Sequence, residues 1–342
     1  MKTEFHNRTG ILDSRVQVEE VSSPSLRSCP ACGQSEAATW RRAPDRMHGR
    51  QKPYTLLRCS QCSLVWLENP PPLEEMGDHY GADYHRLVQQ AGDSSPRRWQ
   101  QHAEILGRYK QSGTLLDLGC SSGAFLESLK GQPWRLYGVE ISTDAAEKAR
   151  ARTGAEVFVG DVENAPFQPN SFDAITCFDV LEHMHQARQV LVKVREWLKP
   201  GGVFYTFLPN IDSAEARIFR SYWCGLELPR HLYHFTPPSL RKLAESVGLE
   251  PLCLTTVRNS QIEYDVRYVC DDVLRYLGFP RKPVSEGIEH AFVGKAVRKV
   301  VRMTLSNPFS GICAAFGLGQ SIRAILQKPM QDADSSVKQR TS

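Results

Sequence analysis

The stretch that most constrains the fold is Thr114–Phe125, which reads TLLDLGCSSGAF. Its first part, Thr114–Leu118, is almost entirely apolar, and such a short run is typical of a strand buried on both faces of a sheet. Gly119 and Gly123 then bracket a tight turn, where glycine permits positive φ and lets the backbone approach a ligand. A helix should follow from Ala124, and free N–H groups at its start can face a polar or anionic group. We therefore predict a strand, a glycine turn and a helix, which is the ligand site of a doubly wound sheet.

Further strands and helices alternate after this stretch, and two of the strands end in an acid. This alternation predicts an α/β fold built around a parallel sheet. The predicted strands are Arg135–Ile141, Val157–Asp161, Phe172–Asp179, Val203–Leu208, Glu250–Val257 and Ser321–Lys328, with helices at 187–198, 214–223 and 239–247.

The succession, with LKPGG at 198–202, resembles the class I S-adenosylmethionine-dependent methyltransferases. The resemblance covers residues 99–257 and the last strand, and it implies a doubly wound, Rossmann-like methyltransferase sheet. It also implies S-adenosylmethionine as cofactor and methyl transfer as the reaction. Cys120 stands where many relatives have a second glycine, and its small side chain should leave the turn intact.

The resemblance places cofactor contacts at the ends of the strands. Glu140 can accept two hydroxyl hydrogen bonds from a ribose, and Asp161 can accept one from the adenine amino group. Ile141 and Val162 would sandwich the adenine, and Asp117 could meet the ammonium group of the cofactor. The predicted cofactor-binding residues are Asp117, Gly119, Cys120, Gly123, Glu140, Ile141, Asp161, Val162 and Phe178.

Two segments offer candidates for the acceptor side. The segment from Phe178 to Met184, FDVLEHM, resembles the one that faces the methyl group in the ubiquinone O-methyltransferase group. His183 could take a proton from an acceptor hydroxyl, because imidazole titrates near neutrality. Alternatively it bonds only its neighbours at a helix start, or holds a divalent cation together with Asp179 and Glu182.

The second segment, Arg230–Phe235, follows the fifth strand and should lie at the same edge of the sheet. It is rich in side chains that bind polar ligands. We predict three catalytic candidates, in the order His231, His183 and His234. The alternative for His234 is structural packing ahead of a helix cap.

Two CxxC pairs, Cys29 with Cys32 and Cys59 with Cys62, precede the predicted sheet. Each pair can offer two thiolates from one tight turn, which is the ligand pattern of a zinc ribbon. Four cysteine ligands leave no open coordination position, so we expect a structural zinc ion. Neither pair lies between a strand and a helix as in a thioredoxin-like redox motif, which argues against redox chemistry.

Composition and segment boundaries complete the picture. The 342 residues carry a net charge of only +4, Met1–Glu20 has no apolar signal-peptide core, and the ten cysteines suit a reducing compartment, so we expect a cytoplasmic protein. A basic amphipathic helix is predicted at 292–305. A helix that caps the domain and exposes its basic face to solvent explains this pattern better than peripheral membrane contact does. The predicted segments are a disordered lead (1–27), the ribbon (28–68), a linker or lid (69–98), the core (99–258), a helical insertion (259–318), the last strand (319–329) and a tail (330–342).

The predicted function is methyl transfer from S-adenosylmethionine to oxygen, nitrogen or carbon of a small-molecule or sugar-linked acceptor. One alternative is an RNA methyltransferase that grips RNA through the ribbon. The modest charge and the absence of an N-P-P-Y/F-type motif after the fourth strand argue against it. The other is a non-catalytic module that binds the cofactor or a partner. The sequence leaves the acceptor, the methylated atom and the oligomeric state open.

Overall fold

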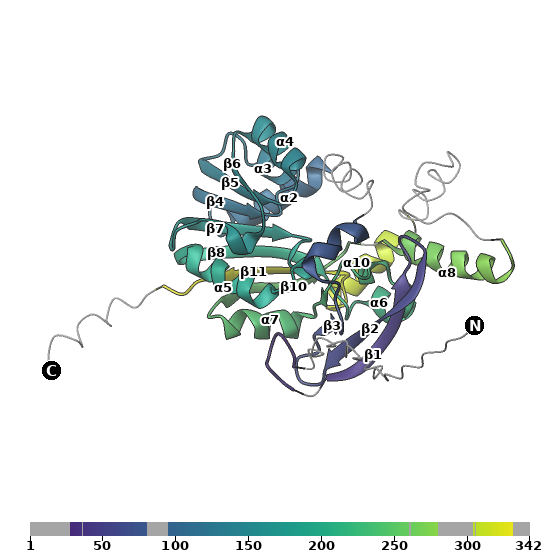
Figure 1. The fold of residues 1–342 in the computed structure, drawn as a ribbon. Coiled ribbons are helices and arrows are strands. Elements are labelled where there is room, and N and C mark those ends of the chain that lie inside the picture. Colours follow the sequence, from purple (N-terminus) through teal and green to yellow (C-terminus); the bar gives the residue numbers. More distant parts are fainter. Residues whose placement is uncertain are drawn as a thin grey trace, which may run out of the picture.

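A computed structural model describes residues 28–330, except 36, 81–94, 260, 280–303 and 305 (Figure 1). The predicted lead at 1–27, nearly all of the helix at 292–305, residues 81–94 of the linker or lid and nearly all of the tail therefore lie outside the described residues. Within the described part, no helix is long and apolar enough to cross a membrane.

A seven-stranded sheet forms the larger part of the molecule, with the order β10-β11-β8-β7-β4-β5-β6. Neighbouring strands from β8 to β6 pair in parallel, whereas β11 pairs antiparallel with both of its neighbours. The strands of this sheet are β4 (Gly113–Leu118), β5 (Trp134–Glu140), β6 (Glu156–Val159), β7 (Phe172–Phe178), β8 (Leu198–Pro209), β10 (Glu250–Val257) and β11 (Ser321–Gln327). This arrangement confirms the α/β doubly wound sheet predicted from the sequence.

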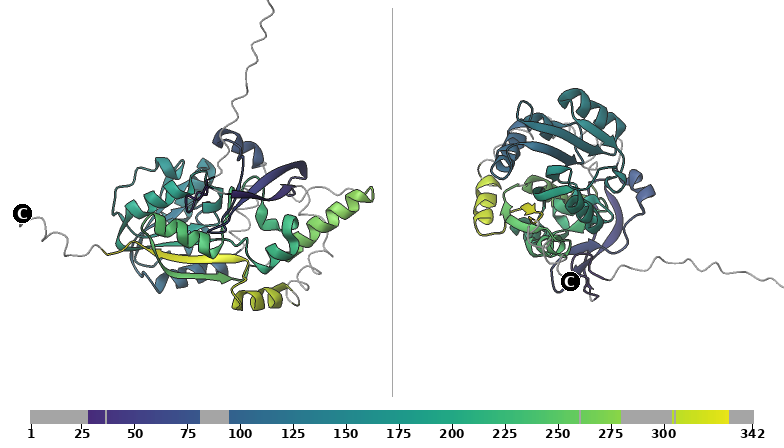
Figure 2. Two further views of the ribbon diagram at one scale, coloured as in Figure 1. Left: turned by 90° about the horizontal axis from the view of Figure 1, so that it is seen from below. Right: turned by 90° about the vertical axis from the view of Figure 1, so that its left-hand side faces the viewer.

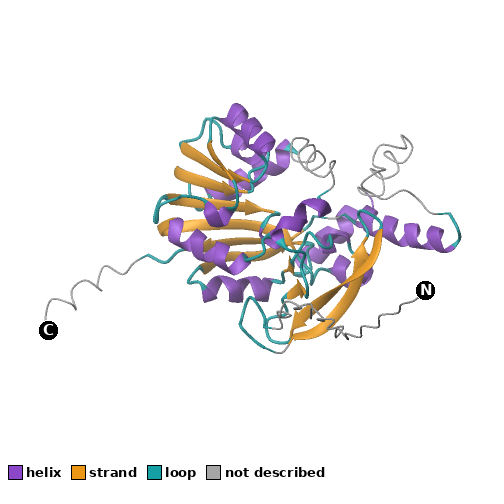
Figure 3. Cartoon of the chain, in the orientation of Figure 1, coloured by secondary structure: helices purple, strands orange, loops and turns teal. Residues whose placement is uncertain are grey.

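Helices cover both faces of this sheet (Figures 1 and 3). One buried cluster joins α2, α3 and α4 to the sheet, and a second joins α5 and α7 to its other face. The helices are α2 (Pro96–Gly107), α3 (Ala124–Ser128), α4 (Thr143–Thr153), α5 (Ala187–Trp197), α6 (Ala214–Phe219), α7 (Pro237–Ser246), α8 (Ile262–Tyr276) and α10 (Asn307–Ala315). Short 3-10 turns are η1 (Leu73–His79), η2 (Val162–Asn164), η3 (Leu181–His183), η4 (Arg220–Tyr222) and η5 (Cys224–Leu226).

A second sheet contains the cysteine-rich segment, with β1 (Ala37–Asp45), β2 (Arg50–Cys59) and β3 (Val65–Leu67) in antiparallel order. Its fourth strand is β9 (Tyr233–His234), which comes from the segment after β8 and pairs with β3. In Figures 1 and 2 the long β1–β2 hairpin, drawn in purple, lies across the same end of the large sheet as α6. Residues 28–68 therefore do not complete a sheet by themselves.

Two elements differ in length from their predictions. The helix predicted at 214–223 ends at Phe219, because Arg220 has a φ of +53° and cannot continue it. The strand predicted from Val203 begins instead at Leu198, so the LKPGG residues belong to β8. Pairing with neighbouring strands lengthens the strand, and the backbone conformation at Arg220 shortens the helix. Neither effect follows from local residue propensity.

Candidate functional site

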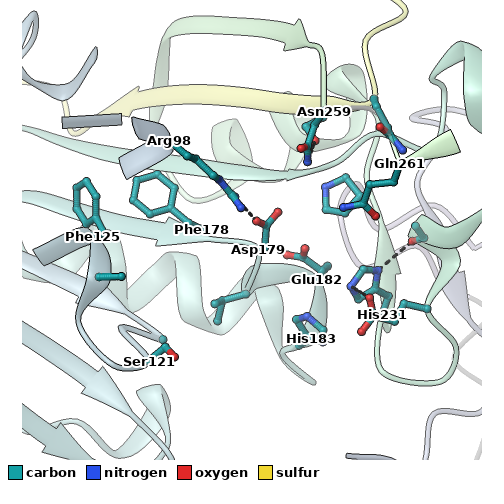
Figure 4. A pocket seen from close by; sticks show the side chains of 18 of the residues that line it. Arg98, Ser121, Phe125, Phe178, Asp179, Glu182, His183, His231, Asn259 and Gln261 are labelled. Atoms are coloured by element: carbon teal, nitrogen blue, oxygen red, sulfur yellow. Dashed lines mark hydrogen bonds and ion pairs between the residues drawn. The ribbon is translucent and has the colours of Figure 1, made fainter. Parts of the chain in front are cut away.

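A cavity of about 350 Å³ opens at the carboxyl ends of β4 and β7. One wall comes from the glycine turn after β4. We call this wall, together with the ends of β5 and β6, the cofactor half. The other wall comes from residues 179–183, 223–231, 259–261 and 320–321, and we call it the acceptor half. Figure 4 shows side chains of both walls facing one another. The lining includes Asp117, Gly119, Cys120, Ser121, Phe178, Asp179, Glu182, His183, Trp223, Glu227, His231, Asn259, Gln261 and Gln320.

The glycine turn leaves no room for side chains at its two key positions. Gly119 has a φ of +70°, and a Cβ atom there would lie 2.6 Å from Val180 Cγ2. Gly123, with a φ of +79°, is the N-cap of α3, and its Cβ would lie 3.0 Å from the Cα of Ala149. The turn can therefore bring bare backbone to a ligand, as a nucleotide-type cofactor requires.

Of two acids predicted for cofactor binding, Glu140 stabilises this turn and Asp117 bonds the neighbouring strand β7. The carboxylate of Glu140 accepts hydrogen bonds from the backbone N–H groups of Ser121 and Ser142, both at 2.9 Å. Asp117 is buried and accepts a 2.7 Å bond from the hydroxyl of Thr176. Burial raises the pKa of Asp117 to about 7, a cost that a neighbouring cation would relieve.

The remaining predicted cofactor residues divide into two groups. Cys120 and Phe178 line the cavity, and Phe178 packs edge-on against Phe125 with ring centroids 4.7 Å apart. Glu140, Ile141, Asp161 and Val162 lie beyond the cavity lining, at the ends of β5 and β6. Ile141 is 62% exposed, so its side chain is free to cover a ligand at that edge.

The three predicted catalytic histidines do not all reach the cavity. His183 and His231 line it with ring centroids 4.5 Å apart. His234 lies instead within β9, outside the cavity lining, and its Nε2 donates to the carbonyl of Leu226 at 2.9 Å. The ring of His234 lies with its centroid 6.1 Å from that of His231 but outside the cavity lining, because the β3–β9 pairing holds it in the second sheet, and its catalytic role stays a prediction.

The two cavity histidines are tied to main-chain carbonyls. His183 Nδ1 donates to Arg230 O at 3.1 Å, and His231 Nδ1 donates to Gly225 O at 2.9 Å. Burial lowers the pKa of His183 and lowers that of His231 to about 3, although Glu227 acts in the opposite direction on both. Both rings are therefore neutral at pH 7, and protonating either would place a cation in a desolvated site.

Glu182 is a cavity residue that the sequence suggested only as a cation ligand. It is 1% exposed, and neither carboxylate oxygen has a hydrogen-bond partner among the described residues. Burial, followed by repulsion from Asp179, raises its pKa well above the usual range. Figure 4 shows its carboxylate between Asp179 and His231. Ligand atoms of Glu182, His183 and His231 lie within 4.8 Å of one another, so His231 rather than Asp179 completes this group.

Backbone strain and an ion pair also mark the cavity. Ser121, Asp179 and Glu227 line it with positive φ values of 48°, 53° and 38°, a conformation that costs energy for residues other than glycine. Arg98 from α2 donates to Asp179 at 2.5 Å, and both residues line the cavity. Such strain persists only where the surrounding structure enforces it, and it is concentrated at functional sites.

Sequence reasoning missed Arg98, Trp223, Asn259, Gln261 and Gln320 as lining residues. A signal existed for two of them. Asn259 follows the end of β10, and Gln320 precedes β11, which runs antiparallel to β8. Both positions fall at the edge where β8 ends, so strand direction alone could have placed them there.

The four cysteines of the two CxxC pairs come together as predicted. Their sulfur atoms lie within 4.8 Å of one another, with 3.4 Å between Cys29 and Cys62 and 3.5 Å between Cys32 and Cys59. Thiolates at zinc-bond length in a tetrahedron are separated by about 3.8 Å, so a small outward shift would fit the ion. The donor set therefore suits a closed, four-sulfur site.

Comparison with known proteins gives consistent matches to methyltransferases. Residues 89–254 match the family described as "Methyltransferase domain". The ubiquinone biosynthesis O-methyltransferase of Thiobacillus denitrificans is 28% identical over 180 residues, which cover 49% of this chain and 78% of that protein. The mitochondrial enzyme of the same name from Schizosaccharomyces pombe is 26% identical over 51% of this chain and 64% of its own length.

Among solved structures, a SAM-dependent methyltransferase from Archaeoglobus fulgidus aligns with a TM-score of 0.48 and 17% identity, covering 72% of this chain and all (100%) of that one. That score is too low to support conclusions by itself, and the sequence matches carry the assignment. The matched domain contains the glycine turn, both strand-end acids and the segment with Glu182 and His183. The chain is a class I S-adenosylmethionine-dependent methyltransferase whose core is similar to that of the ubiquinone O-methyltransferases.

Proposed function

We propose that this enzyme transfers the methyl group to a hydroxyl oxygen of a small-molecule or glycosyl acceptor bound in the acceptor half of the cavity. The observation that carries the proposal is the buried carboxyl of Glu182, which has no hydrogen-bond partner among the described residues and faces the same cavity as the glycine turn. A hydroxyl acceptor must lose a proton as its oxygen attacks, and this carboxyl is placed to take it. The relatives named O-methyltransferases support the choice of oxygen.

The cofactor half would hold S-adenosylmethionine through the bare backbone of the glycine turn, with Glu140 and Asp161 at the ribose and adenine. The bound cofactor supplies an already activated methyl group on a sulfonium. The protein must therefore align the acceptor, exclude water and accept a proton.

Glu182 suits the role of base better than the predicted histidines do. Protonation of Glu182 neutralises a buried charge, whereas protonation of His183 or His231 creates one. The upward pKa shift of Glu182 favours its protonated form, whereas the proposal requires the carboxylate, which the positive charge of the bound cofactor would stabilise. The histidines would then orient the acceptor hydroxyl, as neutral hydrogen-bonding groups.

We also infer that the cysteine cluster holds a structural zinc ion. The four sulfurs would fill all four positions of a tetrahedral site, so this ion would stabilise the ribbon without contacting the acceptor.

The function is tested by mass spectrometry of cell extract incubated with the protein and isotopically labelled methyl donor. We expect a labelled, nuclease-resistant small molecule carrying an O-methyl group. A labelled RNA would contradict the proposal and favour the RNA methyltransferase alternative. Cofactor binding without any labelled product would favour a non-catalytic role.

The base is tested with the labelled product in hand. Glu182→Gln keeps the shape of the side chain and should lower turnover by ~10²–10⁴ with unchanged cofactor affinity. His231→Gln is the matched comparison, and its smaller expected loss separates positioning from proton transfer. A larger loss for His231→Gln would contradict the assignment of Glu182 as the base.

A further inference from the structure

The cysteine-rich sheet has no part in the reaction as proposed, yet one end of it reaches the acceptor half. Asp45, the last residue of β1, is 0% exposed, and its carboxylate lies 3.6 Å from the guanidinium of Arg230, which is also 0% exposed. Such a pair is stable only if further hydrogen bonds satisfy both partners. The structure supplies these bonds from several separate parts of the chain.

Arg230 is held on each side of its guanidinium. Its Nε donates to Glu227 at 3.2 Å, and its Nη1 donates to His48 Nδ1 at 2.9 Å and to the carbonyl of His79 at 3.1 Å. The backbone N–H of His48 in turn donates to Asp45 at 3.2 Å. Arg230 is therefore immobilised by groups from the β1–β2 hairpin, from η1 and from its own segment.

The main chain of Arg230 reaches the cavity directly. Its carbonyl accepts the 3.1 Å bond from His183 Nδ1, so the lone pair of that imidazole is on Nε2. Two more bonds continue the connection, from Leu232 N–H to Glu182 O at 2.8 Å and from Leu67 N–H to Leu232 O at 2.9 Å. The edge of β3, the Arg230–Leu232 segment and the turn that carries Glu182 and His183 are thus bonded in series.

Apolar packing supports the same connection. Val65 and Leu67 of β3 share one buried cluster with Trp223, Leu226 and Leu232 of the acceptor half. A shift of the hairpin would therefore move both the backbone and the side chains of this wall.

We propose that the cysteine-rich sheet is the outer wall of the acceptor site, and that Asp45 and Arg230 are positioning residues that fix the orientation and tautomer of His183. The inference rests on the proposed function in one respect only, which is that the acceptor binds against this wall. Its test uses the folded protein without any acceptor, so it can fail independently of the function.

The experiment is long-range ¹H–¹⁵N NMR of the histidine rings in the full chain, with His183 assigned by loss of its signals in His183→Gln. In the native protein we expect a single tautomer protonated at Nδ1. Asp45→Asn should replace it with a mixture of tautomers, and Asp45→Glu should restore it at least partly. Calorimetry should find unchanged S-adenosylmethionine affinity in both variants.

The matched control is Asp212→Asn. It breaks the 3.3 Å ion pair between Arg58 and Asp212, which also joins the cysteine-rich sheet to the rest of the molecule but does not touch Arg230. The control should leave His183 unchanged. An unaltered His183 tautomer in folded Asp45→Asn, or the same change in the control, would overturn the proposal. If Asp45→Asn does not fold, His48→Asn removes a neighbour of the same guanidinium, and an unaltered His183 there would overturn it equally.

Discussion

The cofactor half and the acceptor half of the cavity are built in different ways. The cofactor half comes from consecutive strand–turn–helix units, and its glycine turn, Asp117 and Glu140 lie within Thr114–Glu140. The acceptor half assembles residues from η3, η5, the segment before β9, the residues after β10 and the start of β11. It is also backed by the cysteine-rich sheet, whose residues are far away in the sequence.

Because the two halves are built from different contacts, we expect that the cofactor half can keep its geometry when the acceptor half loses it. The turn of the cofactor half is stabilised by short-range bonds, such as those that Glu140 makes to Ser121 and Ser142. The acceptor half depends on contacts such as Asp45 with Arg230 and β3 with β9. Each experiment below asks whether the two halves respond separately.

Loss of the cysteine site should produce the largest effect. Purified protein should carry one zinc ion per chain, and Cys59→Ser should release it, because structural zinc sites of this kind contribute on the order of 10 kcal/mol. Hydrogen exchange should then rise in residues 28–68 and also in 223–235, while 113–161 stays protected. Elemental analysis without zinc would contradict the site, and faster exchange confined to 28–68 would contradict its link to the acceptor half.

Gly119→Val should abolish cofactor binding. The added side chain would collide with Val180 and require a φ of +70°, which a β-branched residue rarely adopts. The measurement is calorimetric titration with S-adenosylmethionine, with Gly107→Ala as a control because no atom lies within 4 Å of its Cβ position and its φ is not positive. Retained affinity would mean that the turn does not approach the cofactor.

Glu140→Ala should weaken cofactor binding by about 1.5–3 kcal/mol, the value of hydrogen bonds to a charged group. The native carboxylate also bonds Ser121 and Ser142, so part of the loss would come from loosening the turn. Glu140→Gln separates the two contributions, because its amide oxygen can still accept one backbone bond. Equal affinity for both variants and the native protein would show that this acid does not contact the ribose.

The smallest effect concerns acid stability and compares two buried histidines, His102 of α2 and His234 of β9. Burial lowers the pKa of His102 to about 3 and that of His234 to about 4, below the value of about 6.5 expected for the unfolded chain. The unfolded state therefore binds more protons below pH 6.5, and stability falls by up to about 1.4 kcal/mol per pH unit for each group.

His102→Gln and His234→Gln should each flatten this decline between pH 6.5 and about 4, relative to the native protein at the same pH. The measurement is denaturant unfolding at a series of pH values, followed by far-UV circular dichroism. His102 bonds the hydroxyl of Tyr205 at 2.6 Å and His234 bonds Leu226, so glutamine can preserve a hydrogen bond at each site. An unchanged slope in either variant would mean that this histidine is not buried in the neutral form.

Local sequence patterns predicted the cofactor half well. Apolar runs, the two glycines and the acids at strand ends are short-range signals, and the strands they predict are present in the seven-stranded sheet. The four cysteines likewise meet because the spacing of each pair brings two sulfurs into one turn. The roles of individual residues at the cofactor remain predictions.

The acceptor half was harder to predict, because strand pairing and burial decide which polar side chains face a cavity. His231 and His234 belong to one short segment, yet the pairing of β9 with β3 directs only His231 to the cavity. Glu182 and His183 are neighbours, yet of the two only the carboxyl lacks a hydrogen-bond partner in the part of the chain that the structure describes, and only its pKa is raised.

The sequence by itself determined the class of fold, the cofactor and the cysteine site, since each depends on residues whose contacts are local or whose spacing is short. The tertiary structure decided which groups surround the acceptor and that the cysteine-rich sheet, through Asp45 and Arg230, belongs to that wall. The physical reason is that desolvation and long-range pairing depend on everything packed around a side chain, and no local pattern records those neighbours.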